Sequence, residues 1–175
     1  NRMEGFKTND YVHEYAVDMR VYNSFSYYNG HYDAWDYDRY GNSPGFAIHE
    51  TNDNDANERM RVLKNNIAFA NRGGPVGLPS GAMYTHEYNS WDLPVVVSNE
   101  DFVNLDVDQL LAPRKPDGSL PDITFGHLRS DSDLIDAGVV IAGVHCASAG
   151  EHPGGDCLEW YGAAPDLGAF EFVPG

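Results

Sequence analysis

Apolar and polar residues alternate in two segments of the chain, 21–30 and 63–72, which lie 42 residues apart. Alternation with a period of two is typical of β-strands. The offset is consistent with two coils of about 21 residues each in a solenoid. The matching apolar residues are Val21, Phe25, Tyr27, Leu63, Ile67 and Phe69.

Asparagines also occupy matching places in the two segments, Asn23 with Asn65 and Asn29 with Asn71. In a parallel solenoid, identical amides on successive coils can hydrogen-bond along the axis, and asparagine tolerates the left-handed bend that ends a strand. The pair Asn29-Gly30 is equally typical of a hairpin turn in an antiparallel sheet. Both arrangements remain open on this pattern alone.

Further along the chain the pattern changes. Residues Gly45–His49 predict the strand of the intervening coil, and after Tyr88 the repeat disappears. Residues 95–97 predict a short strand and 99–103 a capped helical turn. The expected core includes Val21, Phe25, Ile48, Leu63, Ile67, Phe69, Leu134 and Ile135.

The second half of the chain is expected to close the solenoid. Three prolines between 113 and 121 indicate an extended stretch. Residues 131–137 are expected to cover the apolar end of the last coil, with Phe170 and Phe172 on a final strand that fills this cap. We therefore divide one domain into coils over residues 1–92 and a terminal coil, proline-rich segment and cap over 93–175.

The net charge limits the kinds of molecule that the protein can bind. The 175 residues are enough for one domain, and their net charge of −16 argues against nucleic acids and anionic membranes, because phosphates would be repelled. No apolar run approaches the ~20 residues that a membrane span needs. We expect a monomer. Because the residues from Glu4 onward resemble the middle of a repeat, we also expect a fragment of a longer chain.

The two cysteines, Cys146 and Cys157, enclose a short loop. An even count at close spacing favours a disulfide and an extracellular protein. A zinc site that adds His145 and His152 is the alternative, although its spacing fits no standard zinc pattern.

Four stretches of the second half resemble the C-terminal half of family 9 polysaccharide lyases, the pectate-lyase group. They are NSWDLP, APRKPDGSLPD, SDLIDAG and APDLGAFE, at residues 89–94, 112–122, 132–138 and 164–171. The resemblance implies an all-β chain folded as a right-handed parallel β-helix. It also implies secretion and the calcium-assisted β-elimination of an acidic polysaccharide, polygalacturonate.

The resemblance points to Lys7 as the catalytic residue. In this family the base is a lysine in a Gly-Phe-Lys motif, which Gly5-Phe6-Lys7 matches. A lysine can accept a proton only if burial or nearby positive charge lowers its pKa. A surface lysine on a strand edge is the alternative. The family's calcium-binding aspartates precede this motif, so we assign no metal ligand in this chain and expect the chain by itself to be inactive.

In the segment after Lys7, Asp33-Ala34-Trp35-Asp36 resembles the family's next coil. Arg39 can pair with a uronate carboxylate or, alternatively, with Asp36 or Asp38. The expected substrate-binding residues are Asp33, Trp35, Asp36, Tyr37 and Arg39. In a second alignment Asp33, Asp36 and Asp38 would themselves bind calcium. The place of the lysine would then fall on Ala47, and the site would be inactive.

Aromatic residues are unusually dense around the same segment. They can stack on sugar rings from a groove or fill the interior of a coil, and we expect both uses. The aromatic run comprises Tyr27, Tyr28, His31, Tyr32, Trp35, Tyr37 and Tyr40.

Three functions fit these observations. The first is a pectate-lyase-like enzyme acting on acidic polysaccharide. The second is a non-catalytic β-helix that binds carbohydrate or forms a surface module, and the third is an enzyme for another polysaccharide. Fold alone does not choose among them.

Overall fold

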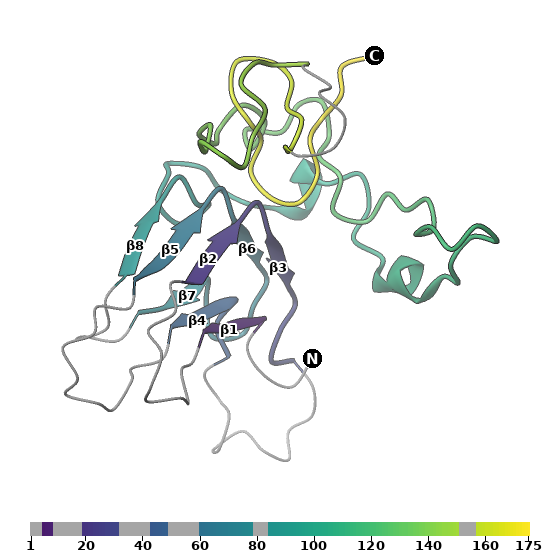
Figure 1. The fold of residues 1–175 in the computed structure, drawn as a ribbon. Coiled ribbons are helices and arrows are strands. Elements are labelled where there is room, and N and C mark those ends of the chain that lie inside the picture. The colour runs from purple at the N-terminus through teal and green to yellow at the C-terminus, as the bar shows by residue number, and fades with distance from the viewer. Residues whose placement is uncertain (1–4, 9–18, 32–42, 49–59, 79–83, 151–156) are drawn as a thin grey trace, which may run out of the picture.

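The computed structural model describes residues 5–8, 19–31, 43–48, 60–78, 84–150 and 157–175 (Figure 1). Its strands form three parallel sheets, which we name A, B and C. Sheet A contains β1 (Phe6–Thr8), β4 (Phe46–Ile48) and β7 (Val76–Gly77). Sheet B contains β2 (Met19–Tyr22), β5 (Arg61–Lys64) and β8 (Tyr84–Glu87), and sheet C contains β3 (Phe25–Tyr27) and β6 (Ile67–Phe69).

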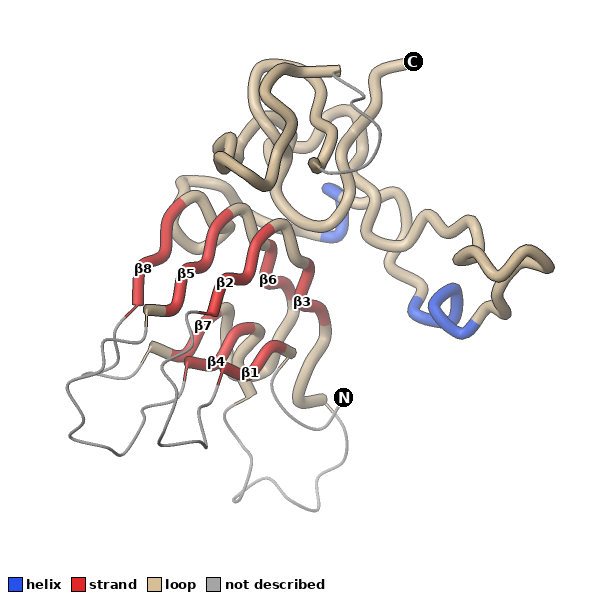
Figure 2. Tube along the Cα trace, in the orientation of Figure 1, coloured by secondary structure: helices blue, strands red, loops and turns tan. Residues whose placement is uncertain are grey.

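Each sheet takes one short strand from successive turns of the chain, which is the arrangement of a parallel β-helix. The prediction of an all-β, right-handed parallel β-helix is confirmed. The antiparallel hairpin at Asn29-Gly30 is excluded, because the preceding strand β3 pairs with β6 in parallel. Beyond β8 the described residues contain no strand, only two short 3₁₀ helices, η2 (Asn99–Asp101) and η3 (Val107–Leu111) (Figure 2).

The predicted coil length was wrong. Val21 pairs directly with Leu63, and Phe25 with Ile67, so the offset of 42 residues is one coil and not two. The strand β4, expected in an intervening coil, belongs to the same coil as β5 and β6. The error has a physical reason: each coil crosses three sheets, so alternating segments recur within one coil and mimic a shorter repeat.

The inside of the coils is packed by side chains from sheets A and B. Phe46, Ile48 and Leu63 are buried there, and the ring of Phe6 stacks on that of Phe46 with 4.8 Å between centroids. Ala68 of sheet C also packs against this cluster. Because neighbouring residues of a strand face opposite sides, the larger side chains of sheet C face outward.

That outward face of sheet C holds a second core. Ile67 is buried against residues from the second half of the chain, Phe102, Leu128, Leu134 and Leu167. We call residues 93–150 and 157–175 the outer layer, because they pack beside the coils at this face (Figure 1). All eight expected core residues belong to one of the two clusters or pack against it.

Three predictions for the outer layer need correction. Residues 131–137 cover the side of sheet C and not the end of the solenoid, because Leu134, Ile135 and Ala137 pack with Ile67. Residues 170–172 form no strand, and Phe170 and Phe172 are only half-buried, whereas Leu167 is fully buried. Residues 95–97 form no strand either, because Val95 and Val97 pack into the second core while their backbone pairs with no other strand. The helical turn near 99–103 is confirmed as η2.

Candidate functional site

The candidate base lies on sheet A. Lys7 is in register with Ala47 of the next coil, and Ala47 with Gly77 of the third. Gly5-Phe6-Lys7 and Gly45-Phe46-Ala47 are therefore two copies of one structural position. Ala47, whose place the second alignment gave to the lysine, is only 5% exposed.

The glycine and phenylalanine of this motif are explained by packing alone. A Cβ on Gly5 would lie 2.1 Å from Ser26 Oγ, and one on Gly45 would lie 2.6 Å from Asn71 Nδ2. Phe6 and Phe46 fill the interior of the coils. Packing therefore accounts for the first two residues of the motif, and the functional hypothesis rests on the third, Lys7, which is in register with Ala47.

The expected substrate-binding residues Asp33, Trp35, Asp36, Tyr37 and Arg39 lie outside the described residues, as does Asp38. The described residues before and after this segment, Asn29 and Ser43, both bond to the next coil. Asn29 O accepts a hydrogen bond from Arg72 N–H (3.0 Å), and Ser43 O accepts one from Gly73 N–H (3.0 Å). Both ends thus meet the same stretch of the next coil, at the corner between sheets C and A.

The predicted asparagine ladder is confirmed. Asn29 Nδ2 donates to Asn71 Oδ1 at 2.8 Å, and Asn65 Nδ2 to Asn23 Oδ1 at 3.4 Å. Asn23 and Asn65 adopt the left-handed conformation, with φ of 44° and 57°. At the other corner the left-handed residues are Tyr28 and Ala70, one position before the predicted asparagines.

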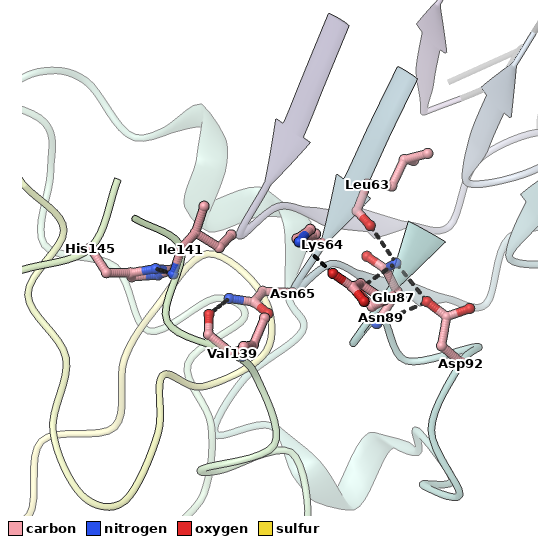
Figure 3. Close-up of polar contacts among 9 residues, drawn as sticks. All are labelled: Leu63, Lys64, Asn65, Glu87, Asn89, Asp92, Val139, Ile141 and His145. Carbon is pink, nitrogen blue, oxygen red and sulfur yellow. Dashed lines mark hydrogen bonds and ion pairs between the residues drawn. The ribbon is translucent and has the colours of Figure 1, made fainter. Parts of the chain in front are cut away.

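A second row of the ladder reaches the third coil. Asn66 Nδ2 donates to Asn89 Oδ1 (2.8 Å), and Asn89 Nδ2 donates to Leu63 O (2.9 Å) and Asp92 Oδ2 (2.7 Å), as Figure 3 shows for Asn89. Asp92 Oδ1 lies 2.5 Å from His86 Nδ1. These fully buried amides are satisfied by neighbouring coils, which identifies them as structural.

The ladder also anchors the outer layer. Asn65 Nδ2 donates to Val139 O, and Val139 N–H donates to Asn65 Oδ1, both at 2.9 Å (Figure 3). Gly168 N–H donates to Asn65 O at 2.8 Å. Gly168 of the 164–171 stretch and Val139, which directly follows the 132–138 stretch, therefore bind one buried asparagine of the coils.

The disulfide Cys146–Cys157 is present. The zinc alternative is excluded in this state, because both sulfur atoms are used in the bond. His145, which that site would have needed, is buried, and its Nδ1 accepts from Ile141 N–H at 2.9 Å. Burial lowers the pKa of His145, so its neutral form is favoured. His152 lies outside the described residues.

Three carboxyl groups link the 132–138 and 164–171 stretches of the outer layer. Asp136 Oδ1 accepts from Ala163 N–H, Asp166 Oδ1 from Asp136 N–H (both 2.8 Å), and Glu171 Oε1 from Asp166 N–H (2.9 Å). Burial, and next the charge of Asp166, raise the pKa of Glu171 to about 7. Burial also raises the pKa of Asp166. Each carboxyl is committed to backbone donors, so the cluster holds the outer layer together.

Calcium does not fit the described residues. No group of three or more histidine, cysteine, aspartate or glutamate side chains within them could hold a metal ion. The alternative cluster of Asp33, Asp36 and Asp38 lies outside them. Within the same described part of the chain, no helix has the length and apolar character to span a membrane.

The aromatic run was expected to fill the coil interior in part, but Tyr27 packs on the outward face of sheet C, against Phe69 of the second core and against Phe125. Tyr28 is 53% exposed and stacks on His31 with 4.1 Å between ring centroids. No substrate contact was assigned to this pair from the sequence, because an aromatic run does not show which rings remain exposed.

Two pectate lyases are similar in sequence to part of the chain. Pectate lyase L of Dickeya chrysanthemi is 37% identical over 83 residues, which cover 47% of this chain and 16% of that protein. Pectate lyase L of Dickeya dadantii is 36% identical over 83 residues, with the same two shares of 47% and 16%. No protein-family model matches the chain.

One crystal structure, of the pectate lyase Pel9A, is similar over nearly the whole chain. The TM-score is 0.63 and the sequence identity 27%, over 97% of this chain and 32% of that one. The chain thus spans about a third of the length of this solved relative and a smaller share of the two in sequence.

Proposed function

Because the chain is a pectate-lyase-like parallel β-helix, we propose that the protein is secreted and cleaves polygalacturonate by calcium-assisted β-elimination, with Lys7 as the base. The observation that carries the proposal is the position of Lys7. Lys7 lies in β1 of sheet A, in register with Ala47 of the next coil, and completes the Gly-Phe-Lys motif.

The chemistry proposed for Lys7 is a proton transfer. A neutral Lys7 amine takes the proton on C5 of a galacturonate residue, α to its carboxylate. The electron pair left on C5 forms the C4–C5 double bond, and the glycosidic oxygen on C4 leaves with the pair of the broken bond. An amine can act in this way only when it is unprotonated, so activity is expected to rise with pH.

Calcium belongs to the proposal through the family resemblance. A cation bound to the uronate carboxylate would stabilise the negative charge that develops beside it. The described residues offer no ligand set for it, so we assign no residue to the cation. Removal of calcium by EDTA, followed by its return, tests the requirement directly.

Asp33, Trp35, Asp36, Tyr37 and Arg39 complete the proposal as substrate-binding residues. The segment that carries them starts and ends at the corner beside sheet A. An arginine guanidinium matches the geometry of a uronate carboxylate, which is the role proposed for Arg39.

The test uses the full-length protein, because this chain by itself is expected to be inactive, and follows the absorbance of the new double bond on polygalacturonate with calcium. Lys7→Ala should lower the rate by roughly 10²–10⁴-fold, the usual loss for a general base. Lys115→Ala is the matched control, because Lys115 lies in the outer layer and pairs with Asp122. A wild-type rate for Lys7→Ala would remove the assignment.

A carbohydrate-binding β-helix without activity is the second candidate. It is favoured by Ala47, which shows that the fold needs no lysine at this position of sheet A. Binding of oligogalacturonates by wild-type protein, with no double bond formed at any calcium concentration, would support this candidate over the lyase.

A further inference from the structure

The corner between sheets C and A carries a tyrosine that the fold does not require. Tyr28 follows β3 with φ of 54°, and Ala70 takes the matching place after β6 with φ of 52°. Left-handed backbone is strained for any residue with a side chain, and such strain gathers at ligand sites. Ala70 shows that a methyl group is enough for the turn. The turn therefore does not require the phenol ring of Tyr28, which lies 5.7 Å from the ring of Tyr27 between centroids.

The ring of Tyr28 is exposed and held in place. It is 53% exposed, and the imidazole of His31 lies against it with 12° between the ring planes. His31 Nε2 is 2.8 Å from Ala70 O, which ties the imidazole to the next coil. Two flat side chains thus form one rigid unit that still presents open surface.

One cationic side chain, that of Arg72, lies at the same corner. Arg72 Nη1 donates to Gly30 O at 3.3 Å, and Arg72 Cβ lies 3.3 Å from where a Cβ on Gly30 would be. On a chain with a net charge of −16, local cations favour the approach of an anionic sugar. From Arg72 the chain runs within a few residues into β7 of sheet A.

We propose that Tyr28, supported by His31, is a sugar-stacking platform at the edge of sheet A that binds a galacturonate residue of the polysaccharide. The apolar face of a pyranose ring packs on the phenol ring, which offers a large contact area with little conformational entropy to lose. The uronate carboxylate lies toward the guanidinium of Arg72. This inference rests on the proposed function, because that function supplies the class of sugar.

Tyr88 provides a matched control. It is also left-handed (φ 55°) and 40% exposed. It lies at the other corner, between sheets B and C, in the place of Asn23 and Asn65, and among the described residues no ring stacks on it. A general effect of losing an exposed, strained tyrosine would appear equally in Tyr28→Ala and Tyr88→Ala.

The experiment is a calorimetric titration of tetragalacturonate into wild type, Tyr28→Ala, Tyr28→Phe and Tyr88→Ala. Tyr28→Ala should raise Kd by roughly 3–10-fold, the range for losing one aromatic stack. Tyr28→Phe and Tyr88→Ala should bind as wild type does. Circular dichroism checks folding, which we expect Tyr28→Ala to retain because Ala70 fills the same position.

The outcomes separate this inference from the proposed function. If wild type binds and Tyr28→Ala binds equally well, the platform is refuted and the lyase proposal stands. If Tyr88→Ala weakens binding as much as Tyr28→Ala, the platform is refuted in the same way. If the full-length wild type neither binds tetragalacturonate nor cleaves polygalacturonate, both proposals fail. Should Tyr28→Ala not fold, His31→Ala tests the support of the ring, with a smaller rise in Kd expected.

Discussion

In the coils, a side chain contacts the residue at the same position of the next coil. In the outer layer, the contacts do not repeat. Asn29 bonds to Asn71, and Phe6 stacks on Phe46, at the same position of successive coils. In the outer layer Asp136 and Asp166 bind backbone groups that have no repeat. The coils are therefore stabilised by many equivalent contacts along the axis. The outer layer is stabilised by a few specific hydrogen bonds.

The largest expected effect comes from breaking the buried ladder. Asn66 is fully buried and bonds to Ser24 N–H, Val21 O and Asn89 Oδ1. Asn66→Ala leaves these groups without partners, so the free energy of unfolding should fall by roughly 2–5 kcal/mol. Urea unfolding followed by circular dichroism measures the change.

The control for this prediction is Asn99→Ala. Asn99 is exposed at the start of η2, so its loss should change the urea midpoint little. If Asn66→Ala and Asn99→Ala unfold at the same urea concentration, the ladder does not hold the coils together.

A smaller and more local effect is expected from removing the disulfide. It closes a loop of 11 residues, and replacing both cysteines with serine should destabilise the outer layer by roughly 2–3 kcal/mol in the chain-entropy estimate. Hydrogen exchange should accelerate at Cys146 and Leu158, whose backbones are bonded at 2.9 Å. Exchange at Leu63 should stay unchanged. Equal acceleration at Leu63 would show that coils and outer layer unfold as one unit.

The smallest effect concerns pH. The pKa of Glu171 is raised to about 7 from its ordinary 4.5, so the folded protein holds this proton more tightly than the unfolded chain. The resulting stability is complete below about pH 4.5 and is lost as the pH rises through about 7. The raised pKa of Asp166 acts in the same direction.

Glu171→Gln tests this pH dependence, because glutamine cannot ionise. The variant should lose less stability than wild type between pH 5 and pH 8 in thermal unfolding, with Glu100→Gln, an exposed site in η2, as the control. An unchanged pH dependence in Glu171→Gln would mean that Glu171 ionises normally in the folded protein.

The sequence predicted the coils better than the outer layer, and the reason is physical. The strands at Val21 and Leu63 and the paired asparagines could be found because a solenoid repeats its contacts along the chain. The number of residues in a coil could not be found in this way. The three strands of one coil share the same alternation of apolar and polar residues, so they look like separate coils. The packing of Leu134 against Ile67 could not be found either, since it joins residues far apart with no period between them.

The candidate site was predictable in part. The Gly-Phe-Lys motif led to Lys7, and the structure places it in register with Ala47 and explains the glycine and phenylalanine by packing. The paired rings of Tyr28 and His31 could not be singled out, because exposure depends on the turn that places them. The expected substrate-binding residues from Asp33 to Arg39 remain predictions.

The central claim is that Lys7 acts as a base and not as a binding residue. The most direct test measures both properties of Lys7→Ala on one preparation of the full-length protein, turnover of polygalacturonate and Kd for tetragalacturonate. We predict a rate lower by roughly 10²–10⁴-fold with Kd unchanged from wild type. An unchanged rate, or a loss of rate explained by an equal loss of binding, would contradict the claim.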